Sequence, residues 1–425
     1  MRPEKVFKRY DIRGKYSEEL DEEFSERLGK ALGTFIIQNY KHQAVVGRDN
    51  KESSKGLKKS LIEGLISTGV DVIDVGEGPT DFAAWSGMKK DCVSVEVTSS
   101  HMPLEFNGFK LMYPKGNGFV NEDLYAVQNI FREKEFVSGS GSISERPDLK
   151  DEYMDEIADF ASQFSEEDER KIVVDSLGGT AKILPELLRR LGHEVIDISE
   201  KTRPYTDPPN PKPEKLEKLK ERVEDEDAYL GISNDLDADR VTAYHNERFL
   251  SGDEVFCILS QLVEGSVVAS IDTTQGLKDL KEVEYTRVGD PFVMDKALEI
   301  DAELAGEPNG HYSFTDFVPS NSGILTALIL SGLDLEEKLS KIPDYEVRRT
   351  SIPVEDKHKV IEALKENFSG DIISELDGVK FRYQDAEVLV RPSGSSPKVR
   401  VIAEAENKKE ANKALNKTLD RINQF

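Results

Sequence analysis

Two stretches of the sequence repeat the same order of elements, and this repeat limits the folds that the chain can adopt. Residues 65–75 read LISTGVDVIDV, and residues 188–198 read LRRLGHEVIDI. A short strand rich in valine and isoleucine precedes each stretch, at residues 44–46 and 172–174. Each unit therefore reads as a strand, an amphipathic helix, a glycine that ends the helix and a second strand. Repeated units of this kind predict several related α/β domains with largely parallel sheets.

A third and weaker unit follows later in the chain. It consists of a strand at residues 267–269, a helix at 292–298 and a strand near 303–305. Two stretches between the units have the composition of connections. Residues 138–144 (SGSGSIS) are typical of a small-residue linker, and residues 207–213 (DPPNPKP) predict an extended, proline-rich segment.

After Pro343 the pattern changes. Residues 354–368 predict a helix, residues 381–393 alternate as strands, and residues 407–425 predict a terminal helix. We therefore expect an α/β protein with three related mixed α/β domains and a smaller C-terminal α+β domain. The expected domains are residues 1–137, 138–240, 241–343 and 344–425.

The chain is strongly acidic, which limits its partners. Its 57 Lys and Arg residues stand against 82 Asp and Glu residues, for a formal net charge of -25. Such a charge repels nucleic acid and anionic membranes, so neither is an expected partner. No apolar stretch is long enough to span a bilayer or resembles a signal segment, and we expect a cytoplasmic protein. Its 2 cysteines are too few for a disulfide framework.

Residues 97–110 (VTSSHMPLEFNGFK) place hydroxyl groups at the end of a predicted strand. The strand at residues 93–97 runs directly into residues 98–100, and Pro103 prevents its continuation. The carboxyl ends of strands are where α/β sheets place reactive groups. Small hydroxyl residues also form ordinary turns, so this stretch alone does not define a site.

Residues 234–240 (NDLDADR) predict a metal site after another strand. Three aspartates alternate in this stretch: Asp235, Asp237 and Asp239. Clustered carboxylates repel one another unless a cation lies among them, and ligands that are all oxygen suit Mg²⁺ better than zinc. The spacing resembles that of a calcium loop, but the sixth position is Arg240 instead of glycine, which excludes an EF-hand.

Two further loops carry groups suited to a sugar phosphate. Residues 391–400 (RPSGSSPKVR) combine arginines, hydroxyls and a glycine, which together can hold a phosphate dianion. Glu307 and His311, in AGEPNGH, can bind sugar hydroxyls, and the histidine can also move protons. Residues 175–180 (DSLGGT) lack the Lys-Ser/Thr ending of a P-loop, and we interpret them as a tight structural turn.

Taken in order, these segments resemble the α-D-phosphohexomutase family, which includes phosphoglucomutases, phosphomannomutases and phosphoglucosamine mutases. TSSHMPLEFNGFK is similar to the family's phosphoserine loop, and NDLDADR to its metal loop D-G-D-A/G-D-R. GEPNGH resembles the sugar-specificity loop G-E-x-S-G-H, and RPSGSSPKVR the phosphate loop R-x-S-G-T-E-P-x-x-R. FKRYDIRG and VVGRDNKESS, at residues 7–14 and 45–54, resemble two N-terminal landmarks. The resemblance implies four domains around a central cleft, each contributing one loop.

The resemblance also implies the roles of residues in a catalytic centre. Ser100 would carry the phosphoryl group and, with Asp235, Asp237 and Asp239, would bind Mg²⁺. The groups near the transferred phosphoryl group or proton would be Arg13, His101, Lys110, Arg240 and His311. Met102 and Leu236 stand where the family usually has asparagine and glycine. No nucleophile, metal ligand or phosphate arginine is replaced, so we expect an active enzyme.

For the substrate, the resemblance implies that Glu307 binds sugar hydroxyls and that Asn309 occupies the family's usual serine position. The phosphate that does not react would be held by Arg391, Ser393, Gly394, Ser395 and Arg400, and Arg287 would reach the substrate. The implied reaction interconverts hexose 1-phosphate and hexose 6-phosphate of glucose or mannose, through phosphoserine and a bisphosphorylated hexose that also serves as activator.

Three alternatives stay open at this point. Glucosamine 6-phosphate is a second possible substrate. A Mg²⁺-dependent phosphatase would leave the serine loop and the separate phosphate clamp unexplained. A non-catalytic protein that binds sugar phosphates would have no need of Ser100 and the aspartates. The expected partners are small-molecule hexose phosphates, and we expect a monomer or a homodimer.

Overall fold

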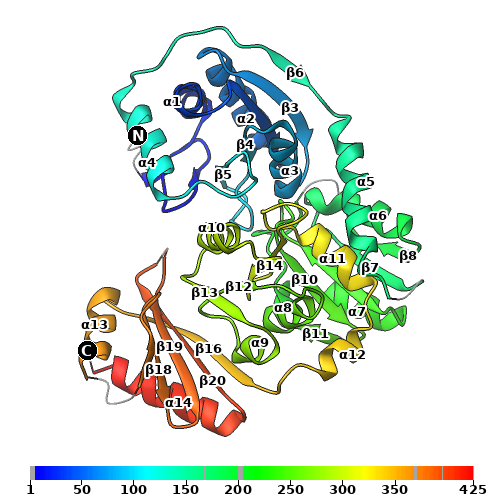
Figure 1. The fold of residues 1–425 in the computed structure, drawn as a ribbon, viewed down its shortest axis with the longest axis vertical. Helices are drawn as coiled ribbons and strands as arrows, with labels where there is room; N and C mark the ends of the chain where they lie inside the picture. The colour runs from blue at the N-terminus through cyan, green and yellow to red at the C-terminus, as the bar shows by residue number, and fades with distance from the viewer. Residues whose placement is uncertain (1–4, 167–168, 200–203, 368–370, 395, 425) are drawn as a thin grey trace.

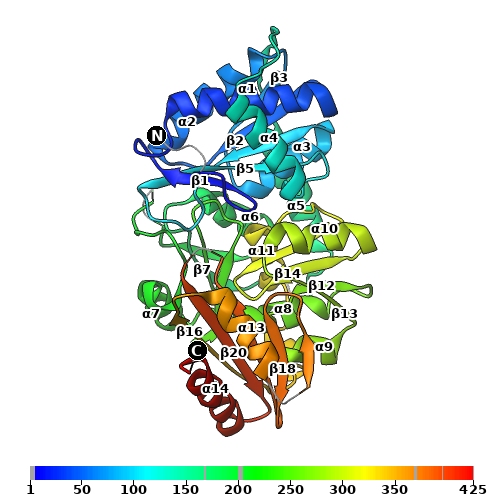
Figure 2. The same ribbon diagram turned by 90° about the vertical axis from the view of Figure 1, so that its left-hand side faces the viewer.

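Four sheets follow one another along the chain, each with its own helices. The computed structural model describes residues 5–166, 169–199, 204–367, 371–394 and 396–424. Within these ranges the first three sheets are mixed and have crossover helices, whereas the fourth is antiparallel. The first and fourth sheets lie at opposite ends of the molecule, with the second and third between them (Figures 1 and 2). The expected three mixed α/β domains and C-terminal α+β domain are confirmed.

The first sheet has the strand order β1-β5-β4-β2-β3-β6. The elements of this domain are β1 (Ile12–Lys15), α1 (Glu22–Asn39), β2 (Gln43–Arg48), α2 (Glu52–Ile66), β3 (Asp71–Glu77), α3 (Thr80–Lys90), β4 (Val93–Val97), β5 (Phe106–Met112), α4 (Asn121–Glu133) and β6 (Ile143–Glu145). Neighbouring residues of β2 face opposite cores: Val46 joins the core of α1 and α2, and Val45 joins the core that contains α3. Because helices cover both faces, β2 is apolar at consecutive positions.

The small-residue stretch expected to be a linker lies along the edge of the first sheet. Its last residues belong to β6, which pairs in parallel with β3. The backbone N–H of Gly141 donates to the carbonyl of Ile66 at 2.8 Å. A Cβ atom on Gly141 would lie only 2.0 Å from the carbonyl oxygen of Val70. Glycine is therefore required for this close approach, and the stretch is docked rather than free.

The second sheet has the strand order β11-β10-β9-β7-β8. Its domain contains α5 (Leu149–Ser162), β7 (Lys171–Asp175), α6 (Leu184–Arg190), β8 (Glu194–Asp197), α7 (Glu217–Asp225), β9 (Leu230–Asn234), β10 (Val241–His245) and β11 (Arg248–Leu250). The two repeated units form equivalent structures, because α2 connects the parallel pair β2–β3 and α6 connects the parallel pair β7–β8. The sheet continues for two strands beyond Arg240, where the sequence placed the end of this domain. The domain boundaries stay a prediction.

The third sheet has the strand order β13-β12-β14-β15. Its domain contains α8 (Gly252–Ser260), β12 (Val267–Ser270), α9 (Gln275–Leu280), β13 (Val283–Thr286), α10 (Asp290–Ile300), β14 (Leu304–Glu307), β15 (His311–Phe314), α11 (Gly323–Ser331) and α12 (Leu335–Ser340). The weak third unit is present, with β12 and β14 parallel. α9 and β13 lie between these two strands in the chain and were not expected from the sequence. β13 is a short strand at the sheet edge, and only its last residue is buried.

The fourth sheet has the strand order β16-β20-β19-β18-β17, and polar side chains join its domain to the third domain. Its domain contains β16 (Glu346–Pro353), α13 (Lys357–Asn367), β17 (Ile372–Ser374), β18 (Val379–Tyr383), β19 (Ala386–Pro392), β20 (Lys398–Ala405) and α14 (Lys408–Ile422). The buried carboxylate of Glu404 accepts the backbone N–H of Gln275 at 2.9 Å. Arg349 and Asp253 form an ion pair at 2.7 Å across the same interface.

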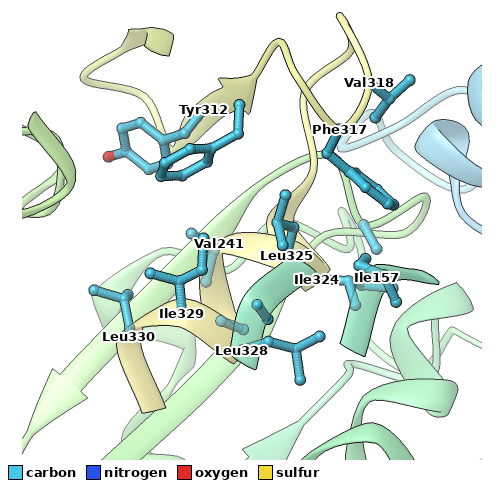
Figure 3. Close-up of a cluster of buried hydrophobic side chains, with 14 of the residues drawn as sticks. Ile157, Val241, Tyr312, Phe317, Val318, Ile324, Leu325, Leu328, Ile329 and Leu330 are labelled. Atoms are coloured by element: carbon cyan, nitrogen blue, oxygen red, sulfur yellow. The ribbon is translucent and has the colours of Figure 1, made fainter. Parts of the chain in front are cut away.

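The second and third domains, in contrast, share one hydrophobic core, which also takes in the α3 side of the first domain. Figure 3 shows side chains of α11 together with Ile157 of α5, Val241 of β10 and Tyr312 of β15. Every residue of α11 is buried, which explains why this helix is apolar on all sides. The shared core fixes the second and third domains relative to each other.

No helix in the described part of the chain is long and apolar enough to cross a membrane.

A buried carboxylate joins the first three domains. Asp81, in the first turn of α3, accepts a hydrogen bond from the hydroxyl of Tyr153 in α5 at 2.7 Å and another from the hydroxyl of Ser322, which caps α11. Burial raises the pKa of Asp81 to about 6. A carboxyl with a raised pKa in the folded state stabilises the protein at low pH, and this contribution is lost as the pH rises through the folded pKa.

We therefore predict how the Asp81→Asn variant differs from the wild type as a function of pH. The free energy of unfolding of the wild type, measured relative to that of the variant, should fall by roughly 1–3 kcal/mol between pH 4 and pH 7. Urea denaturation at several pH values measures this difference. A difference that stays constant over this range would contradict the assignment of a raised pKa to Asp81.

Candidate active site

Three aspartates follow β9 and converge on one point. Asp235, Asp237 and Asp239 are buried, and one carboxylate oxygen from each lies within 4.8 Å of the others. Burial and the neighbouring charges of Asp239 and Asp237 raise the pKa of Asp235 well above its ordinary value. The Oδ1 atom of Asp237 is buried without a hydrogen-bond partner among the described residues. An oxygen-only donor set with an unused oxygen fits a hard divalent cation.

The aspartate loop is supported by the turn at residues 175–180. The backbone N–H and the hydroxyl of Thr180 both donate to the carbonyl of Leu236, at 2.8 and 3.0 Å. A Cβ atom on Gly179 would lie 2.7 Å from the same carbonyl oxygen. The interpretation of this segment as a structural turn is supported, and its role is to hold the aspartate loop.

Leu236 itself is fully buried and lies outside the positive φ range, whereas Ala238 has a φ of 56°. The conformational freedom of glycine is therefore not needed at position 236. We predict that Leu236→Gly lowers the free energy of unfolding by about 3–5 kcal/mol, because it removes a buried side chain and adds backbone entropy. Ala238→Gly, in the same loop, should be neutral or stabilising. Guanidinium denaturation of both variants checks this, and a stable Leu236→Gly protein would contradict it.

Ser100 lies in the turn that follows β4, beside the aspartates. Its backbone adopts a left-handed φ of 50°, which is unusual for a residue other than glycine. The hydroxyl of Thr98 accepts the backbone N–H of Ser100 at 2.9 Å and stabilises this bend. The Ser100 hydroxyl donates to Oδ2 of Asp235 at 2.9 Å and lies 3.1 Å from Nδ1 of His101. Strain of this type is found at functional sites.

Lys110 provides a positive charge on the opposite side of the cluster. It extends from β5 and donates to Asp237 at 2.6 Å and also to Asp239. Burial alone would lower the pKa of Lys110, but these two carboxylates raise it, so the side chain is charged. Burial alone would raise the pKa of Asp239, but Lys110 and His311 hold it well below the usual range.

His311 connects the aspartate loop to the sugar loop of the third domain. Its Nε2 atom lies 3.0 Å from Nε of Arg240 and 3.3 Å from Oδ1 of Asp239. Its Nδ1 atom lies 3.4 Å from Oε2 of Glu307. Burial alone would lower its pKa, but Asp239 and Glu307 raise the pKa of His311 to about 9. In the same loop, the side chain of Asn309 accepts a hydrogen bond from the backbone N–H of His311 at 3.2 Å.

Two arginines act on His101, the neighbour of Ser100. The positive charge of Arg240, the burial of the imidazole and the positive charge of Arg13 all lower the pKa of His101. His101 is therefore a neutral imidazole in contact with the Ser100 hydroxyl. Arg13 extends from β1 and forms an ion pair with Asp11 at 2.8 Å. Apart from Arg13, which acts on His101 through its charge, the residues predicted for the catalytic centre are joined to one another by direct contacts.

Most of the residues predicted to bind phosphate belong to the fourth domain. Arg391, at the end of β19, is buried and lies opposite the exposed Arg400 of β20. The hydroxyl of Ser393 is 2.8 Å from that of Ser396, and Gly394 is exposed. Ser395 lies outside the described residues. Arg287, in the third domain, places its guanidinium 3.7 Å from the centre of the Phe292 ring.

One residue that contacts the catalytic group, and one that lies beside it, were not expected from the sequence. The hydroxyl of Thr80, at the start of α3, donates to Asp237 at 2.7 Å. The buried side chain of Lys51 donates to the hydroxyl of Ser99 at 3.2 Å, next to Ser100. Lys51 belongs to the VVGRDNKESS landmark, which could have indicated it. Thr80 follows a strand, a glycine and a proline, and this context is too common to indicate a site.

Comparison with known proteins agrees with this arrangement. Four family models match in order: "Phosphoglucomutase/phosphomannomutase, alpha/beta/alpha domain I" over residues 4–138, domain II over 151–248, domain III over 251–345, and the C-terminal domain over 350–421. The fold and the site therefore define a phosphohexomutase, an enzyme of the isomerase class. The chain belongs to the phosphoglucomutase/phosphomannomutase family.

Similar proteins match along almost the whole chain. A phosphoglucomutase/phosphomannomutase of Thermococcus kodakarensis is 33% identical, with 97% of each chain covered. A probable phosphoglucosamine mutase of Methanothermobacter thermautotrophicus is 31% identical, with 96% of this chain and 95% of the relative covered. The crystal structure of a family protein from Burkholderia thailandensis has a TM-score of 0.87 and 25% identity, with 100% of this chain and 97% of that chain covered.

Proposed function

We propose that this phosphohexomutase interconverts the 1-phosphates and 6-phosphates of glucose and mannose, with Ser100 as the residue that carries the phosphoryl group. The observation that supports this most directly is the contact of the strained Ser100 with Asp235 and His101. A phosphorylated Ser100 would donate its phosphoryl group to the free hydroxyl of a hexose phosphate. The bisphosphorylated sugar would then return its other phosphoryl group to Ser100.

Asp235, Asp237 and Asp239 would hold Mg²⁺, and the phosphate on Ser100 would add a ligand. The cation would neutralise charge on the transferred phosphoryl group. Lys110, which pairs with Asp237, and Arg240, whose guanidinium contacts His311 beside Asp239, would add positive charge to the same group. Positive charges that are already in place stabilise a phosphoryl transition state without reorganisation.

The proton transfers would involve His101 and His311. Neutral His101 would orient the Ser100 hydroxyl through its Nδ1 atom, and the proton of this hydroxyl would pass to the phosphoryl oxygens as the phosphoryl group returns to the serine. His311 lies between Asp239 and Glu307, where it can exchange a proton with the sugar hydroxyl. Glu307 is buried and keeps its carboxylate fixed by the backbone N–H of Gly289 at 2.8 Å. It would accept hydrogen bonds from the sugar.

The fourth-domain loop would hold the phosphate that does not react. Arg391, Ser393, Gly394 and Ser395 would form this clamp, with Arg400 at its edge and Arg287 reaching from the third domain. The clamp would have to accept a phosphate at the 6-position and at the 1-position in turn. Two separate phosphate sites are what a mutase needs, whereas a phosphatase needs only one.

A second candidate substrate is glucosamine 6-phosphate. It is favoured by the relative in Methanothermobacter thermautotrophicus, which is named a probable phosphoglucosamine mutase. In the sugar loop, Asn309 donates to Glu307 at 3.3 Å, so both side chains are placed to contact the same sugar. The loop sequence is compatible with either substrate.

A coupled assay with Mg²⁺ and a trace of the bisphosphorylated sugar tests the proposal. The 1-phosphates of glucose, mannose and glucosamine are compared at equal concentration. We expect turnover of the glucose and mannose compounds. A protein that turns over glucosamine 1-phosphate alone would replace the first candidate with the second. A folded protein that interconverts none of them would contradict a mutase function.

A further inference from the structure

The carboxylate of Asp377 lies between the phosphate loop and the third domain. It belongs to the turn that connects β17 to β18. Its Oδ2 atom accepts a hydrogen bond from Nε of Arg391 at 2.7 Å and from the backbone N–H of Val288 at 3.4 Å. The side chains of Arg391 and Asp377 are 8% and 11% exposed, so solvent screens this ion pair little.

The turn itself is fixed against the strand that carries Arg391. Gly378 has a φ of 94°, in the range that favours glycine. A Cβ atom at this position would lie 2.2 Å from the carbonyl oxygen of Val390 and 2.7 Å from Cα of Arg391. The backbone next to Asp377 can therefore approach β19 only because residue 378 is glycine. This approach places the carboxylate beside the Arg391 side chain.

The pairing uses only one edge of the Arg391 guanidinium. Arg391 donates to Asp377 through Nε, and its two Nη atoms donate to no protein atom among the described residues. A guanidinium carries five N–H donors, and four of them belong to the Nη atoms. These are the donors that bind a phosphate in a bidentate manner. Asp377 therefore orients the arginine and leaves its phosphate-binding groups available.

On the other side, Asp377 contacts the segment that leads to the sugar loop. Val288 lies between Arg287, whose guanidinium stacks on Phe292, and Gly289, which donates to the carboxylate of Glu307 at 2.8 Å. The hydrogen bond from Val288 thus connects Asp377 to a segment that also holds Glu307. A single carboxylate oxygen links the phosphate loop of the fourth domain to the sugar loop of the third.

We propose that Asp377 is a positioning residue that orients Arg391 for phosphate and ties the phosphate loop to the sugar loop. The inference rests on the proposed function in one respect, namely that Arg391 binds the phosphate of the substrate. It predicts that the loss of Asp377 weakens phosphate binding even though a negative charge is removed. The opposite expectation, that Asp377 only competes with phosphate for Arg391, predicts tighter binding.

The test uses Asp377→Asn and Asp377→Ala in the full chain. The amide of asparagine still accepts a hydrogen bond from Nε but lacks the charge, so its effect should be smaller than that of alanine. For Asp377→Ala we expect KM for glucose 1-phosphate and the Kd for inorganic phosphate, measured by calorimetry, to rise about tenfold or more. kcat should change little, because the clamp binds the ground state and the transition state equally.

Glu375→Gln is the matched control. It removes the same charge two residues away, from a side chain that pairs with Lys365 at 2.8 Å on the other side of the turn. Its KM and Kd should equal those of the wild type. Hydrogen–deuterium exchange gives a readout independent of turnover: a peptide that contains Val288 should exchange faster in Asp377→Ala and not in Glu375→Gln.

The outcomes separate this inference from the proposed function. If the wild type interconverts sugar phosphates and the Asp377 variants keep its KM and Kd or bind phosphate more tightly, the positioning role is wrong and the function stands. A lower Tm with unchanged KM and Kd would also overturn it, because it would show a structural role only. If the wild type binds phosphate without turnover, a weaker Kd in the variants still supports the inference while the mutase function fails.

Discussion

Ser100→Ala is expected to lower kcat by at least about 10³-fold, because it removes the only atom of this residue that can carry a phosphoryl group. The hydroxyl lost in this variant contacts Asp235 and His101, whose positions should change little. The substrate should still bind through the phosphate loop. The variant should therefore show a kcat effect much larger than its KM effect in the mutase assay.

Ser99→Ala is the matched control for this prediction. Ser99 is the adjacent residue, is equally buried and donates or accepts hydrogen bonds of the same type, but its hydroxyl contacts Lys51 instead of the aspartates. We expect it to keep most of the activity. Mass spectrometry of the wild type after incubation with the bisphosphorylated sugar should locate the phosphate on Ser100. Phosphate on Ser99, or a greater loss in Ser99→Ala, would reassign the nucleophile.

Asp235→Asn is expected to lower kcat by about 10²–10³-fold, because it weakens the binding of the cation that neutralises the phosphoryl group. The same substitution should stabilise the protein in the absence of metal by about 1 kcal/mol, since it removes one of three mutually repelling buried carboxylates. Ser100 and the backbone of Arg240 donate to different oxygens of Asp235, and the single amide oxygen of asparagine can accept only one of these two hydrogen bonds.

Thermal denaturation with and without Mg²⁺ measures both effects. The wild type should gain about 2.7 kcal/mol at a concentration of 100 times Kd, whereas Asp235→Asn should gain much less. Asp227→Asn, an exposed residue of the same domain, makes the same change of charge and should respond to Mg²⁺ as the wild type does. A Mg²⁺ response that is equal in wild type and Asp235→Asn would exclude the aspartate loop as the metal site.

The architecture could be predicted from the sequence because its signals are local. The strand, helix, glycine and second strand of each repeated unit follow one another directly in the sequence. The consecutive apolar residues of β2 and β7 follow from burial on both faces of the sheet. The edge elements could not be predicted in this way. β6 forms because glycines allow the backbone to reach β3, and β13 pairs along an edge where only its last residue is fully buried. Neither property is visible in a hydrophobic pattern.

The candidate site could be predicted where a motif carries its chemistry in consecutive residues, as at Ser100 and the three aspartates. Contacts between distant segments could not. Thr80 and Asp237 are 157 positions apart, and no property of residues 78–80 (GPT) indicates that the two are in contact. Asp377 and Val288 are 89 positions apart, and their contact depends on how the fourth domain meets the third. Leu236, which stands where the family usually has glycine, also did not indicate the backbone of the loop, because the positive φ lies at Ala238.

The continuous core of the second and third domains holds the aspartate loop and the sugar loop at fixed positions relative to each other. The aspartates and Glu307 lie on a single rigid body, in which α11 fills the space between β10 and β15 and the backbone of Gly323 donates to Ala238 at 3.0 Å. This packing sets the distance from the aspartate loop to the sugar loop. Under the proposed function, the two isomeric phosphates would be exchanged by rotation of the sugar within that frame, and any adjustment of length would fall to the fourth domain, whose core is separate.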